Sequence, residues 1–511
     1  MKPIQIDGDN FTLEQLYSVV LEGAPVELAP RARERMNASR AVVERLLESD
    51  AAVYGVNTGF GKMASARISR EQIRALQVNL VRSHACGVGA PLSEHETRAM
   101  LALRANAIAK GFSGVRPILA ETLCAMLNKG VHPVIPSQGS VGASGDLAPL
   151  AHLAQVAIGE GEAVLQGRRI AGAQAMQSAG ITPLALEAKE GLALLNGTQG
   201  MLALLALGLR AAEIATDTAD VAAALSLDAL RGSPAAYDER IARVRPYPGH
   251  AISAQNLRRL NNGSAIRESH RPPAKDPRVQ DPYSLRCAPQ VHGAARDVLA
   301  QVRATIAVEL NSATDNPLVF APAGAESGAG EVISGGNFHG QPLAMAADQL
   351  AVALVTLAGI SERRIEQMTN PQTSQLPAFL VRDAGLNSGF MILQVTAAAL
   401  VSEMKTQAAP HSVDSIPTSA NQEDYVSMGM GGARRIEPMM ANLRNVLAIE
   451  LLSACQGIDL LAPLRTGAEA QKAHDLVRKV SPTLEADRSL AHDIAELARL
   501  IDKGSFSAIL R

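Results

Sequence analysis

Long apolar runs with helical spacing are the dominant pattern in this chain. Between Leu343 and Met368, leucines follow a three-four spacing, at positions 343, 350, 354 and 357, and the positions between them hold mostly Ala and Val. A helix with this pattern is buried over most of its circumference, as at the centre of a helical bundle. Similar runs, each predicting a long helix, span residues 201–230, 289–310, 390–407 and 436–461.

The composition also favours helices. Aromatic residues make up 3% of the chain and tryptophan is absent, whereas alanine and leucine are abundant. Sheets prefer β-branched and aromatic side chains, so this composition indicates helices packed closely through small side chains. Thr12 and Gln15 fit a capping box and predict a helix start before Leu16. We therefore predict a mainly α fold with a long central helical bundle.

Two segments break the helical pattern. Residues 231–283 contain clustered Pro, Gly, Arg and Asn, which predict an irregular connection. Long loops of this kind inside compact enzymes are often functional. Residues 320–338 are rich in glycine and predict turns around short strands.

Charge and cysteine usage narrow the class of protein. The 511 residues carry a formal net charge of −2 without a basic stripe, which excludes a protein that relies on phosphate contacts or anionic lipid. Apolar stretches such as Met201–Leu209 end at a charge, well short of a membrane span, and the amino terminus lacks the apolar core of a signal peptide. We expect a soluble cytoplasmic protein. Its four cysteines are widely spaced and are expected to be reduced thiols: Cys86, Cys124, Cys287 and Cys455.

The segment from Gly139 to His152 carries the strongest chemical signal. It reads Gly-Ser-Val-Gly-Ala-Ser-Gly-Asp-Leu-Ala-Pro-Leu-Ala-His. The small residues around Ser144 allow the backbone to fold tightly enough for the Gly145 nitrogen to approach the Ala143 carbonyl carbon. Cyclisation there, which expels the Ala143 carbonyl oxygen as one water, together with loss of a second water at Ser144, gives a conjugated exocyclic methylene. Such a group is a strong electrophile.

A helix is expected to begin directly after this tripeptide. Asp146 is expected to cap that helix, and Pro149 is tolerated in its first turn. The positive end of the helix would face the electrophile and sharpen it. A lone Ala-Ser-Gly is more commonly a plain turn that enters a helix, so the chemical interpretation depends on the whole segment.

Residues 139–152 closely resemble the cofactor-forming segment of the aromatic amino acid ammonia-lyase and aminomutase family. Members of this family carry a methylidene-imidazolone (MIO) group made from Ala-Ser-Gly. The resemblance extends over nearly the whole chain. It implies an MIO group formed from Ala143, Ser144 and Gly145, with no external cofactor.

The resemblance also implies an ammonia-lyase/fumarase-like architecture. A smaller N-terminal domain, residues 1–110, would carry the loop of Tyr54 and the pair Ser83-His84. An elongated helical domain, residues 111–511, would hold the MIO segment 139–152 and the irregular segment 231–283. Members of this family assemble as homotetramers whose active sites draw residues from more than one subunit. The resemblance implies the same assembly here.

Three segments resemble active-site motifs of the family. Residues 54–61 resemble its mobile loop, in which Tyr54 is the catalytic base. A tyrosine has a pKa near 10, so it needs nearby positive charge or donors to hold its phenolate form. Asn196 matches an asparagine that contacts the substrate and the cofactor. Phe338, within residues 335–340, matches an apolar wall of the pocket.

Residues 280–290 resemble the family's carboxylate-binding segment. Arg286 is expected to hold the α-carboxylate through two parallel hydrogen bonds, which a lysine does not reproduce. Gln280 and Tyr283 would line the same pocket, with Tyr283 also counted among the catalytic residues. Residues 387–390, near Gln394, follow the family pattern as packing around the site.

The residues expected to recognise the substrate side chain favour histidine. Ser83-His84 and Glu423 resemble the histidine-specific branch, whereas the branches for phenylalanine and tyrosine tend to carry Phe-Leu or His-Leu and a glutamine there. A buried imidazole needs polar partners, and His84 with Glu423 provides both a donor and an acceptor. A phenyl ring would leave these groups unpaired. Tyr425 departs from the histidine branch, which has a histidine at this position, and it leaves the substrate open.

The resemblance implies a carbon–nitrogen lyase that removes ammonia from L-histidine to give trans-urocanate, the first step of histidine degradation. Two alternatives stay open: an MIO-dependent lyase or 2,3-aminomutase for tyrosine or phenylalanine, and an inactive homologue that serves as a helical scaffold. The sequence contains no H-E-x-x-H, P-loop or Rossmann fingerprint, and we expect neither a metal nor a nucleic-acid partner.

Overall fold

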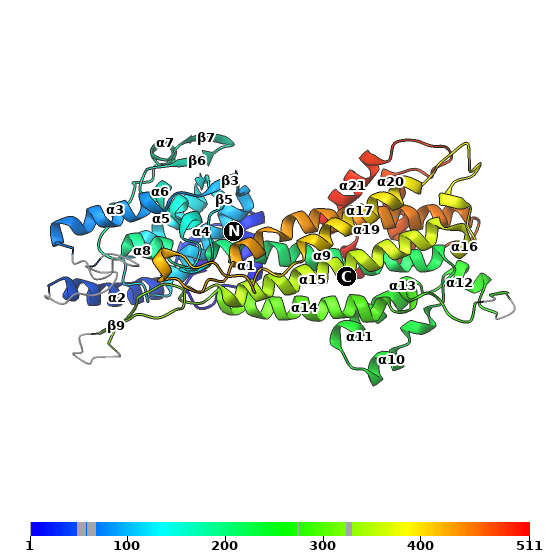
Figure 1. Ribbon diagram of the computed structural model, residues 1–511, viewed down its shortest axis with the longest axis horizontal. Helices are drawn as coiled ribbons and strands as arrows, with labels where there is room; N and C mark the ends of the chain where they lie inside the picture. The colour runs from blue at the N-terminus through cyan, green and yellow to red at the C-terminus, as the bar shows by residue number, and fades with distance from the viewer. Residues whose placement is uncertain (1, 49–57, 59–67, 273–274, 277, 323–329) are drawn as a thin grey trace. The chain divides into compact units, whose positions relative to one another are not determined.

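The computed structural model describes residues 2–48, 58, 68–272, 275–276, 278–322 and 330–511. Most of these residues are helical, which confirms the predicted mainly α fold (Figure 1). The chain forms two compact units. Unit 1 comprises Met1–Leu207, Arg303–Asp348 and Pro410–Arg434, and unit 2 comprises Gly208–Val302, Gln349–Ala409 and Arg435–Arg511. The sequence predicts a different division, into domains of residues 1–110 and 111–511 that fold independently. That division stays a prediction.

The predicted long helices are confirmed. Three of them continue from one unit into the other: α9 (Gln199–Ala229), α14 (Ala288–Glu309) and α15 (Gln341–Thr369). Two more lie in unit 2: α17 (Met391–Gln407) and α19 (Ile436–Leu460). The capping box of Thr12 and Gln15 is also present, at the start of α1 (Leu13–Leu21).

Unit 1 combines helices with short strands. Its helices are α1, α2 (Pro30–Glu48), η2 (Arg70–Gln72), α3 (Ile73–His84), α4 (Glu94–Ala109), α5 (Ile118–Asn128), α6 (Leu147–Ala157), α7 (Gly172–Ser178), α8 (Glu190–Leu195), η6 (Ser419–Asn421) and α18 (Gly429–Arg434). Its core contains α4, which is buried on every side from Thr97 to Ala109. A helix buried in this way needs neighbours all around it, and α1 and α5 are among them.

Among the described residues of unit 1, the strands form four small sheets. Parallel β1 (Ile4–Ile6) and β2 (Val26–Leu28) make one, and antiparallel β3 (Val88–Pro91) and β5 (Pro136–Gln138) make another. The third has the order β4-β6-β7, with β4 (His132–Pro133), β6 (Glu162–Leu165) and β7 (Arg168–Ala171). In the fourth, β8 (Leu318–Phe320) pairs with β9 (Glu331–Ile333). Of the short strands predicted within residues 320–338, β9 lies inside this range and β8 ends at its first residue.

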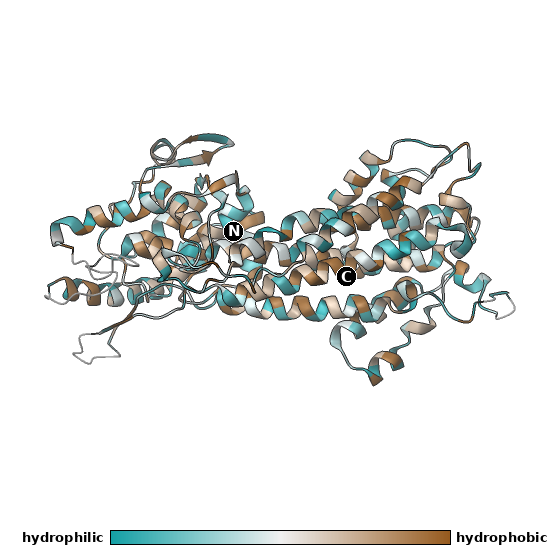
Figure 2. Cartoon of the chain, viewed as in Figure 1, coloured by the Kyte–Doolittle hydropathy of each residue, from teal (hydrophilic) through white to brown (hydrophobic). Residues whose placement is uncertain are grey.

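Unit 2 is almost wholly helical. Besides parts of the long helices, it contains η3 (Pro234–Tyr237), α10 (Glu239–Val244), α11 (Pro248–Leu260), α12 (Ala265–Ser269), α13 (Tyr283–Arg286), α16 (Pro371–Ser374), η5 (Ala378–Leu380), α20 (Ala468–Val480), α21 (Ala491–Asp502) and η7 (Ser507–Leu510). In Figure 2, hydrophobic residues (brown) recur along much of the length of its long helices, with hydrophilic residues (teal) between them. A Cβ added at Gly457 of α19 would lie 2.9 Å from the Cβ of Ala229 in α9. Small residues therefore allow these helices to pack closely, as the composition predicts.

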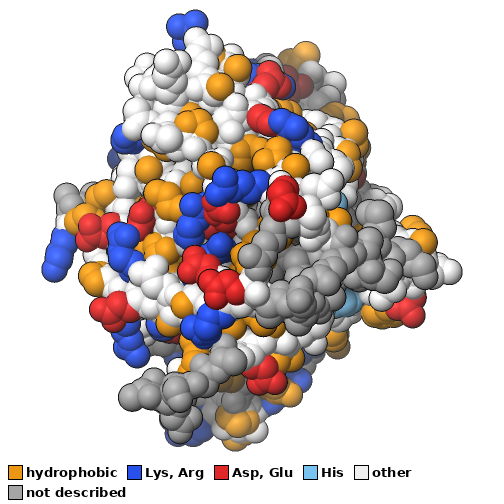
Figure 3. All heavy atoms as spheres, turned by 90° about the vertical axis from the view of Figure 1, so that its left-hand side faces the viewer, with side chains coloured by type: hydrophobic (Ala, Val, Ile, Leu, Met, Phe, Trp, Pro, Cys, Tyr) orange, Lys and Arg blue, Asp and Glu red, His pale blue; other side chains and the backbone are white. Residues whose placement is uncertain are grey.

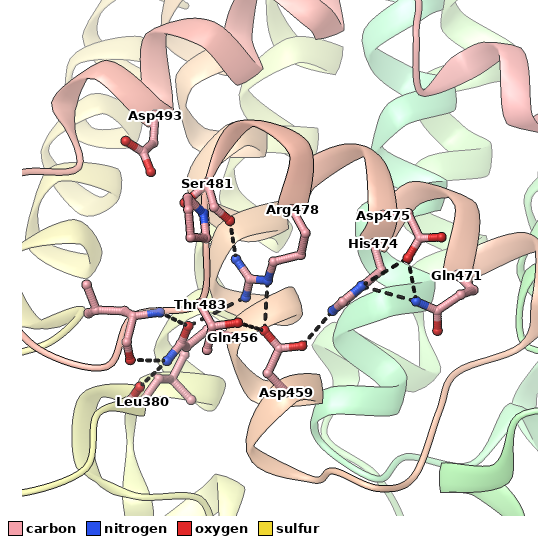
Figure 4. A network of polar contacts seen from close by, with 12 residues as sticks. Leu380, Gln456, Asp459, Gln471, His474, Asp475, Arg478, Ser481, Thr483 and Asp493 are labelled. Carbon is pink, nitrogen blue, oxygen red and sulfur yellow. Dashed lines mark hydrogen bonds and ion pairs between the residues drawn. The ribbon is translucent and has the colours of Figure 1, made fainter.

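A partly buried polar network joins α19 to α20 and the segment after it (Figure 4). The Asp459 carboxylate accepts hydrogen bonds from His474 Nε2 at 2.7 Å, Arg478 Nε at 2.7 Å and Thr483 Oγ1 at 2.6 Å. These donors, the Arg478 cation among them, stabilise the charged form and lower the pKa of Asp459 although burial opposes them. The network fixes the carboxyl-terminal helices onto the bundle.

The segment 231–283 is not irregular throughout, and this part of the prediction was wrong. It contains η3, α10, α11 and α12. Pro248 stands at the first turn of α11, where a helix loses no hydrogen bond to proline. A Cβ at Gly249 would overlap the carbonyl oxygen of Gly293, so glycine is needed there for α11 to approach α14. Residues that resembled loop signals in the sequence therefore start a helix and form a helix contact.

The helix α15 is long and apolar enough to cross a membrane, and among the described residues it is the one helix with this property. Its predicted leucine face is buried, but Val352 is 56% exposed, so the expected burial around most of the helix does not hold for the single chain. Buried Glu362 and Arg364 have partners on other segments of unit 2. A helix with 56% of its most apolar window buried, and with paired charges inside, is typical of a protein core.

Candidate active site

A cavity of about 940 Å³ lies in unit 1 and brings together most of the predicted site residues. Helices α3, α6 and α8 and the segments before α15 and α18 line it. The predicted residues on its wall are Ser83, His84, Ala143, Ser144, Asn196, Phe338 and Glu423. These residues are spread over more than 300 positions of the chain, and the fold gathers them around one hollow.

The tripeptide segment is held from two sides. The Gly142 carbonyl accepts hydrogen bonds from Ser427 Oγ at 3.0 Å and from the Gly340 N–H at 3.2 Å. On the other side, the Asp146 N–H donates to the Gly197 carbonyl at 2.7 Å. Gly145 adopts a left-handed backbone, with φ of +72°, beside Gly197. The sequence prediction of a tight backbone around Ser144 is consistent with this arrangement.

Substituting Gly145 is expected to destabilise the protein more than a positive φ alone would. A Cβ at Gly145 would overlap the Gly197 carbonyl, whereas a Cβ at Gly167, with φ of +75°, meets nothing within 4 Å. Gly167→Ala should therefore report the conformational cost alone, about 1 kcal/mol. Gly145→Ala should lower the free energy of unfolding by a further 1 to 3 kcal/mol or so because of overpacking. Thermal unfolding of both variants checks this, and equal midpoints would contradict the close approach.

Asp146 has a different partner from the one predicted. It stands at the N-cap position of α6, but its side chain does not cap that helix. Instead its carboxylate accepts from the Met201 N–H in the first turn of α9 at 2.7 Å and from Ser140 Oγ at 2.8 Å. Burial raises the pKa of Asp146 to about 6 in spite of these donors. The sequence prediction failed because the capping partner comes from a helix that starts more than fifty residues later.

His84 presents a fixed tautomer to the cavity. Its Nδ1 lies 2.9 Å from the Leu80 carbonyl of the preceding turn, so Nδ1 carries the proton and Nε2 is left as an acceptor. Burial lowers the pKa of His84 below its ordinary value, with nearby Glu423 opposing the shift. The imidazole is therefore neutral at pH 7. Ser83 Oγ donates to the Leu80 carbonyl at 3.1 Å and sits beside the same ring nitrogen.

The Glu423 carboxylate is hydrogen-bonded to the tripeptide. Its Oε1 accepts from Ser144 Oγ at 3.1 Å, and its Oε2 accepts from Thr418 Oγ1 at 2.6 Å. Backbone hydrogen bonds between Thr418 and Glu423 in both directions fix this short loop. The arrangement holds an acceptor within reach of both Ser144 and any molecule in the cavity.

Asn196 ends α8 with its side chain at the cavity wall. The amide nitrogen Nδ2 donates to Asp315 Oδ1 at 3.3 Å and to the Asn316 carbonyl at 3.0 Å. The amide oxygen Oδ1 is buried and has no hydrogen-bond partner. An unpaired buried acceptor in a wall is costly, and it indicates a place for a donor from a bound group.

Tyr425, the departure from the histidine branch, lines the cavity next to Glu423. Its ring is nearly parallel to that of His339, with 6.2 Å between centroids and 13° between planes. His339 accepts from the Gln341 N–H at Nδ1, and its Nε2 donates to the Tyr425 carbonyl at 3.2 Å. Tyr425 is thus attached to the wall through its backbone and its ring, with 58% of the residue exposed.

Gln280, Tyr283 and Arg286 do not line this cavity. They lie in unit 2, where Tyr283 is 69% exposed and the Arg286 guanidinium stands 4.4 Å from its ring centroid. Buried Tyr237 donates to the Leu285 carbonyl at 2.9 Å and holds the turn that carries both side chains. The structure therefore presents this pair on the surface of unit 2. Tyr54 lies outside the described residues.

The sequence interpretation missed several residues of the site. Lys189 and Asp315 form a buried ion pair behind Asn196, and Asn316 lines the cavity itself. The available signal was a charged pair, Lys189-Glu190, leading directly into the apolar run Gly-Leu-Ala-Leu-Leu. Across the described residues, no group of three or more His, Cys, Asp or Glu side chains is arranged to hold a metal ion.

A helical fold with a cavity built around an Ala-Ser-Gly turn defines an enzyme of the aromatic amino acid lyase family. The sequence profile of this family, described as aromatic amino acid lyase, matches residues 11–479, and the chain belongs to it. The family expected from the sequence is thereby confirmed, and the protein is a carbon–nitrogen lyase.

Individual relatives point to the histidine branch. The chain is 55% identical over 518 residues to a histidine ammonia-lyase of Koribacter versatilis, covering 100% of both chains. Among solved structures, it resembles histidine ammonia-lyase from Trypanosoma cruzi with a TM-score of 0.90 and 45% identity, over 99% of this chain and 94% of that one. It also resembles tyrosine aminomutase from Streptomyces globisporus, with a TM-score of 0.93 and 39% identity, over 99% and 98% of the two chains.

Proposed function

We propose that this protein removes ammonia from L-histidine to give trans-urocanate, using an electrophile made from its own residues 143–145. The observation that carries the proposal is the meeting of Ser144, His84 and Glu423 around one cavity. Ser144 belongs to the electrophile, and the other two side chains suit an imidazole. The high identity to histidine ammonia-lyases supports the same reaction.

The residues around Ser144 fit an MIO group. Gly145 has the left-handed backbone and the lack of space for a Cβ that a tight turn requires. The amino-terminal end of α6 begins two residues after Gly145, so its positive end favours electron withdrawal from this turn. The cyclised tripeptide supplies an electrophile that turns the amine nitrogen of the substrate into a leaving group. Asn196 Oδ1 offers an acceptor for the hydrogens of that amine.

Recognition of the imidazole falls to His84 and Glu423. His84 Nε2 accepts from the ring N–H of the substrate, because its own proton is held on Nδ1 by Leu80. The Glu423 carboxylate accepts from the other ring nitrogen when that nitrogen carries a proton, so His84 and Glu423 act as two acceptors and not as the donor and acceptor expected from the sequence. A phenyl ring offers no donor, so phenylalanine would leave His84 Nε2 without a partner in the cavity. Ser83 keeps His84 in this orientation, and Phe338 forms an apolar wall.

Proton removal and carboxylate binding belong to residues other than the described residues that line the cavity. Tyr54 acts as the base for the β-proton, as the family resemblance implies, and Tyr283 assists it. Arg286 holds the α-carboxylate with two parallel hydrogen bonds, next to Gln280. None of these last three side chains lines the cavity, and the family resemblance implies active sites shared between subunits, so we propose that a second subunit supplies them.

A homotetramer with shared sites follows from that proposal. Exposed apolar side chains on the helices of unit 2 support an association: Val352 is 56% exposed, Ile392 62% and Val395 51%. Large apolar side chains gathered on exposed helices are typical of surfaces that bind another protein. A second copy of this chain is the simplest occupant for a symmetric oligomer.

We also propose that the enzyme acts in the cytoplasm, without a nucleic-acid or membrane partner. All four cysteines are free thiols, which suits a reducing compartment. On the face drawn in Figure 3, basic and acidic side chains are interspersed among apolar ones. Such a mixed surface provides no attraction for phosphate groups.

The deciding experiment offers one amino acid at a time. L-histidine, L-tyrosine and L-phenylalanine are supplied separately, and the ultraviolet absorbance of the unsaturated acid is recorded. Histidine should give the strong signal. A signal with tyrosine and none with histidine would overturn the assignment. A β-amino acid seen by NMR among the products would instead indicate an aminomutase.

Replacing His84 tests the imidazole contact directly. His84→Leu removes the acceptor and should lower kcat/KM for L-histidine by roughly 10- to 100-fold, the scale of one unpaired buried group. His95→Leu, on the exposed side of α4, is the matched control and should leave kcat/KM unchanged. Equal values for the two variants would show that His84 does not recognise the substrate.

A further inference from the structure

A buried ion pair lies directly behind the cavity wall. Lys189, at the residue before α8, donates from Nζ to Asp315 Oδ2 at 2.7 Å. The two side chains are 0% and 3% exposed. Neither residue lines the cavity, and the reaction proposed above uses neither of them.

The pair stabilises the fold less than its burial suggests. Removing two charges from water costs about as much free energy as their attraction returns, and apolar side chains of similar volume often serve as well. Lys189 also holds a left-handed backbone, with φ of +73°, which L-residues other than Asn and Asp rarely adopt. Burial lowers the pKa of the Lys189 ammonium, because the charged form loses its stabilisation by water. A purely structural role accounts poorly for a lysine at this position.

The second oxygen of the same carboxylate reaches the site. Asp315 Oδ1 accepts from Asn196 Nδ2 at 3.3 Å and from the Asn316 N–H at 2.7 Å. The Asn316 carbonyl accepts from Asn196 Nδ2 at 3.0 Å. Both acceptors therefore face the amide nitrogen, and they repel the amide oxygen if the amide flips. The orientation of Asn196 is fixed, with Oδ1 turned away from Asp315 and left unpaired.

The backbone of Asn196 is fixed as well. Arg104, which is 1% exposed, donates from one guanidinium nitrogen to the Asn196 carbonyl at 3.0 Å and to Gln199 Oε1 at 2.6 Å. Gln199 in turn donates to Thr314 Oγ1 at 2.8 Å, one residue before Asp315. The asparagine and the aspartate thus belong to one connected buried network.

We propose that Lys189 and Asp315 are positioning residues, which orient the Asn196 amide so that its oxygen accepts from the amine of the substrate. Lys189 donates to one oxygen of the Asp315 carboxylate, and the other oxygen accepts from the amide nitrogen. Without the lysine, the carboxylate loses the donor that fixes its place, so the amide is no longer held. The inference rests on the proposed function, since it assigns a role within the same site.

Two variants separate positioning from stability. Lys189→Met should lower kcat for L-histidine by about 10- to 100-fold with a smaller change in KM, as is common when the partner of an active-site ligand is lost. The double variant Lys189→Met/Asp315→Asn should recover most of the activity. The amide oxygen of the new asparagine accepts from Asn196 without a counterion.

The neighbouring ion pair supplies the control. Arg116 donates to buried Glu190, the residue after Lys189, at 2.7 Å. Arg116→Met should lower the thermal midpoint and leave kcat and KM unchanged. Intact mass of each variant reports whether the tripeptide has lost two waters, so that kcat is compared per cyclised site.

The outcomes are distinguishable. A wild type that turns over no histidine refutes the proposed function. A wild type that is active, with Lys189→Met equal to Arg116→Met in kcat and KM, refutes only the positioning role. Loss of cyclisation in Lys189→Met, without a change of kcat per cyclised site, also refutes positioning and assigns the pair to folding.

Discussion

Ser144→Ala is expected to lower turnover of L-histidine by at least about 10³-fold. Loss of one hydrogen-bond donor that stabilises a transition state lowers kcat by up to about this factor. The substitution leaves no hydroxyl to expel, so the tripeptide has no route to an exocyclic methylene. Intact-mass spectrometry checks the cause. The wild type should weigh less than its sequence predicts by the mass of two waters, and the variant should not.

Ser178→Ala is the matched control for this experiment. Ser178 is exposed at the end of α7, outside the cavity, so the substitution should change neither mass deficit nor turnover. Full turnover in Ser144→Ala would refute the electrophile. A wild type with its full sequence mass and no activity would favour the scaffold alternative.

Arg286→Ala should lower kcat/KM for L-histidine by roughly 10²-fold or more through loss of a charge-assisted hydrogen-bond pair, with most of the effect in KM. Arg286→Lys should recover little of this loss, because an ammonium lacks the paired donors of a guanidinium. Steady-state kinetics of the two variants measures both effects. Arg240→Ala, at an exposed residue paired with Asp238, is the control.

The same variant tests whether subunits share their sites. Ser144→Ala and Arg286→Ala chains, unfolded together and refolded as a mixture, should regain part of the activity that each lacks alone. In a shared site, some cavities receive an intact Ser144 from one chain and an intact Arg286 from another. A mixture no more active than its separate components would refute sharing. As a control, the chain that carries both substitutions, mixed with either single variant, should restore no activity.

Sequence alone was sufficient where the relevant residues are neighbours in the chain. The long helices follow from local spacing, and the segments around Ser144, His84 and Glu423 are each recognisable over a few positions. The fold then brings these segments to one cavity. Their meeting was implied by family resemblance and by no pattern within the chain, because each contact joins residues far apart in sequence.

What the sequence did not predict depends on long-range partners. Asp146 was expected to cap α6, yet its carboxylate binds the start of α9. Lys189 and Asp315 are 126 positions apart, and no local pattern pairs them. The sequence did not predict α11 because Pro248 and Gly249 are also common in loops. Their roles, at the start of α11 and in its contact with α14, become visible only in the structure.

The two-sided hold on the tripeptide segment has a consequence for the order of events during synthesis. Met428 N–H donates to the Val141 carbonyl at 2.9 Å, and Ser427 binds Gly142, so the turn acquires its native surroundings only after nearly the whole chain has left the ribosome. If the proposed ring closure depends on those surroundings, it follows folding. The predicted mass deficit of two waters would then be a permanent record that a given molecule once reached its native state, and it would persist after that molecule is denatured.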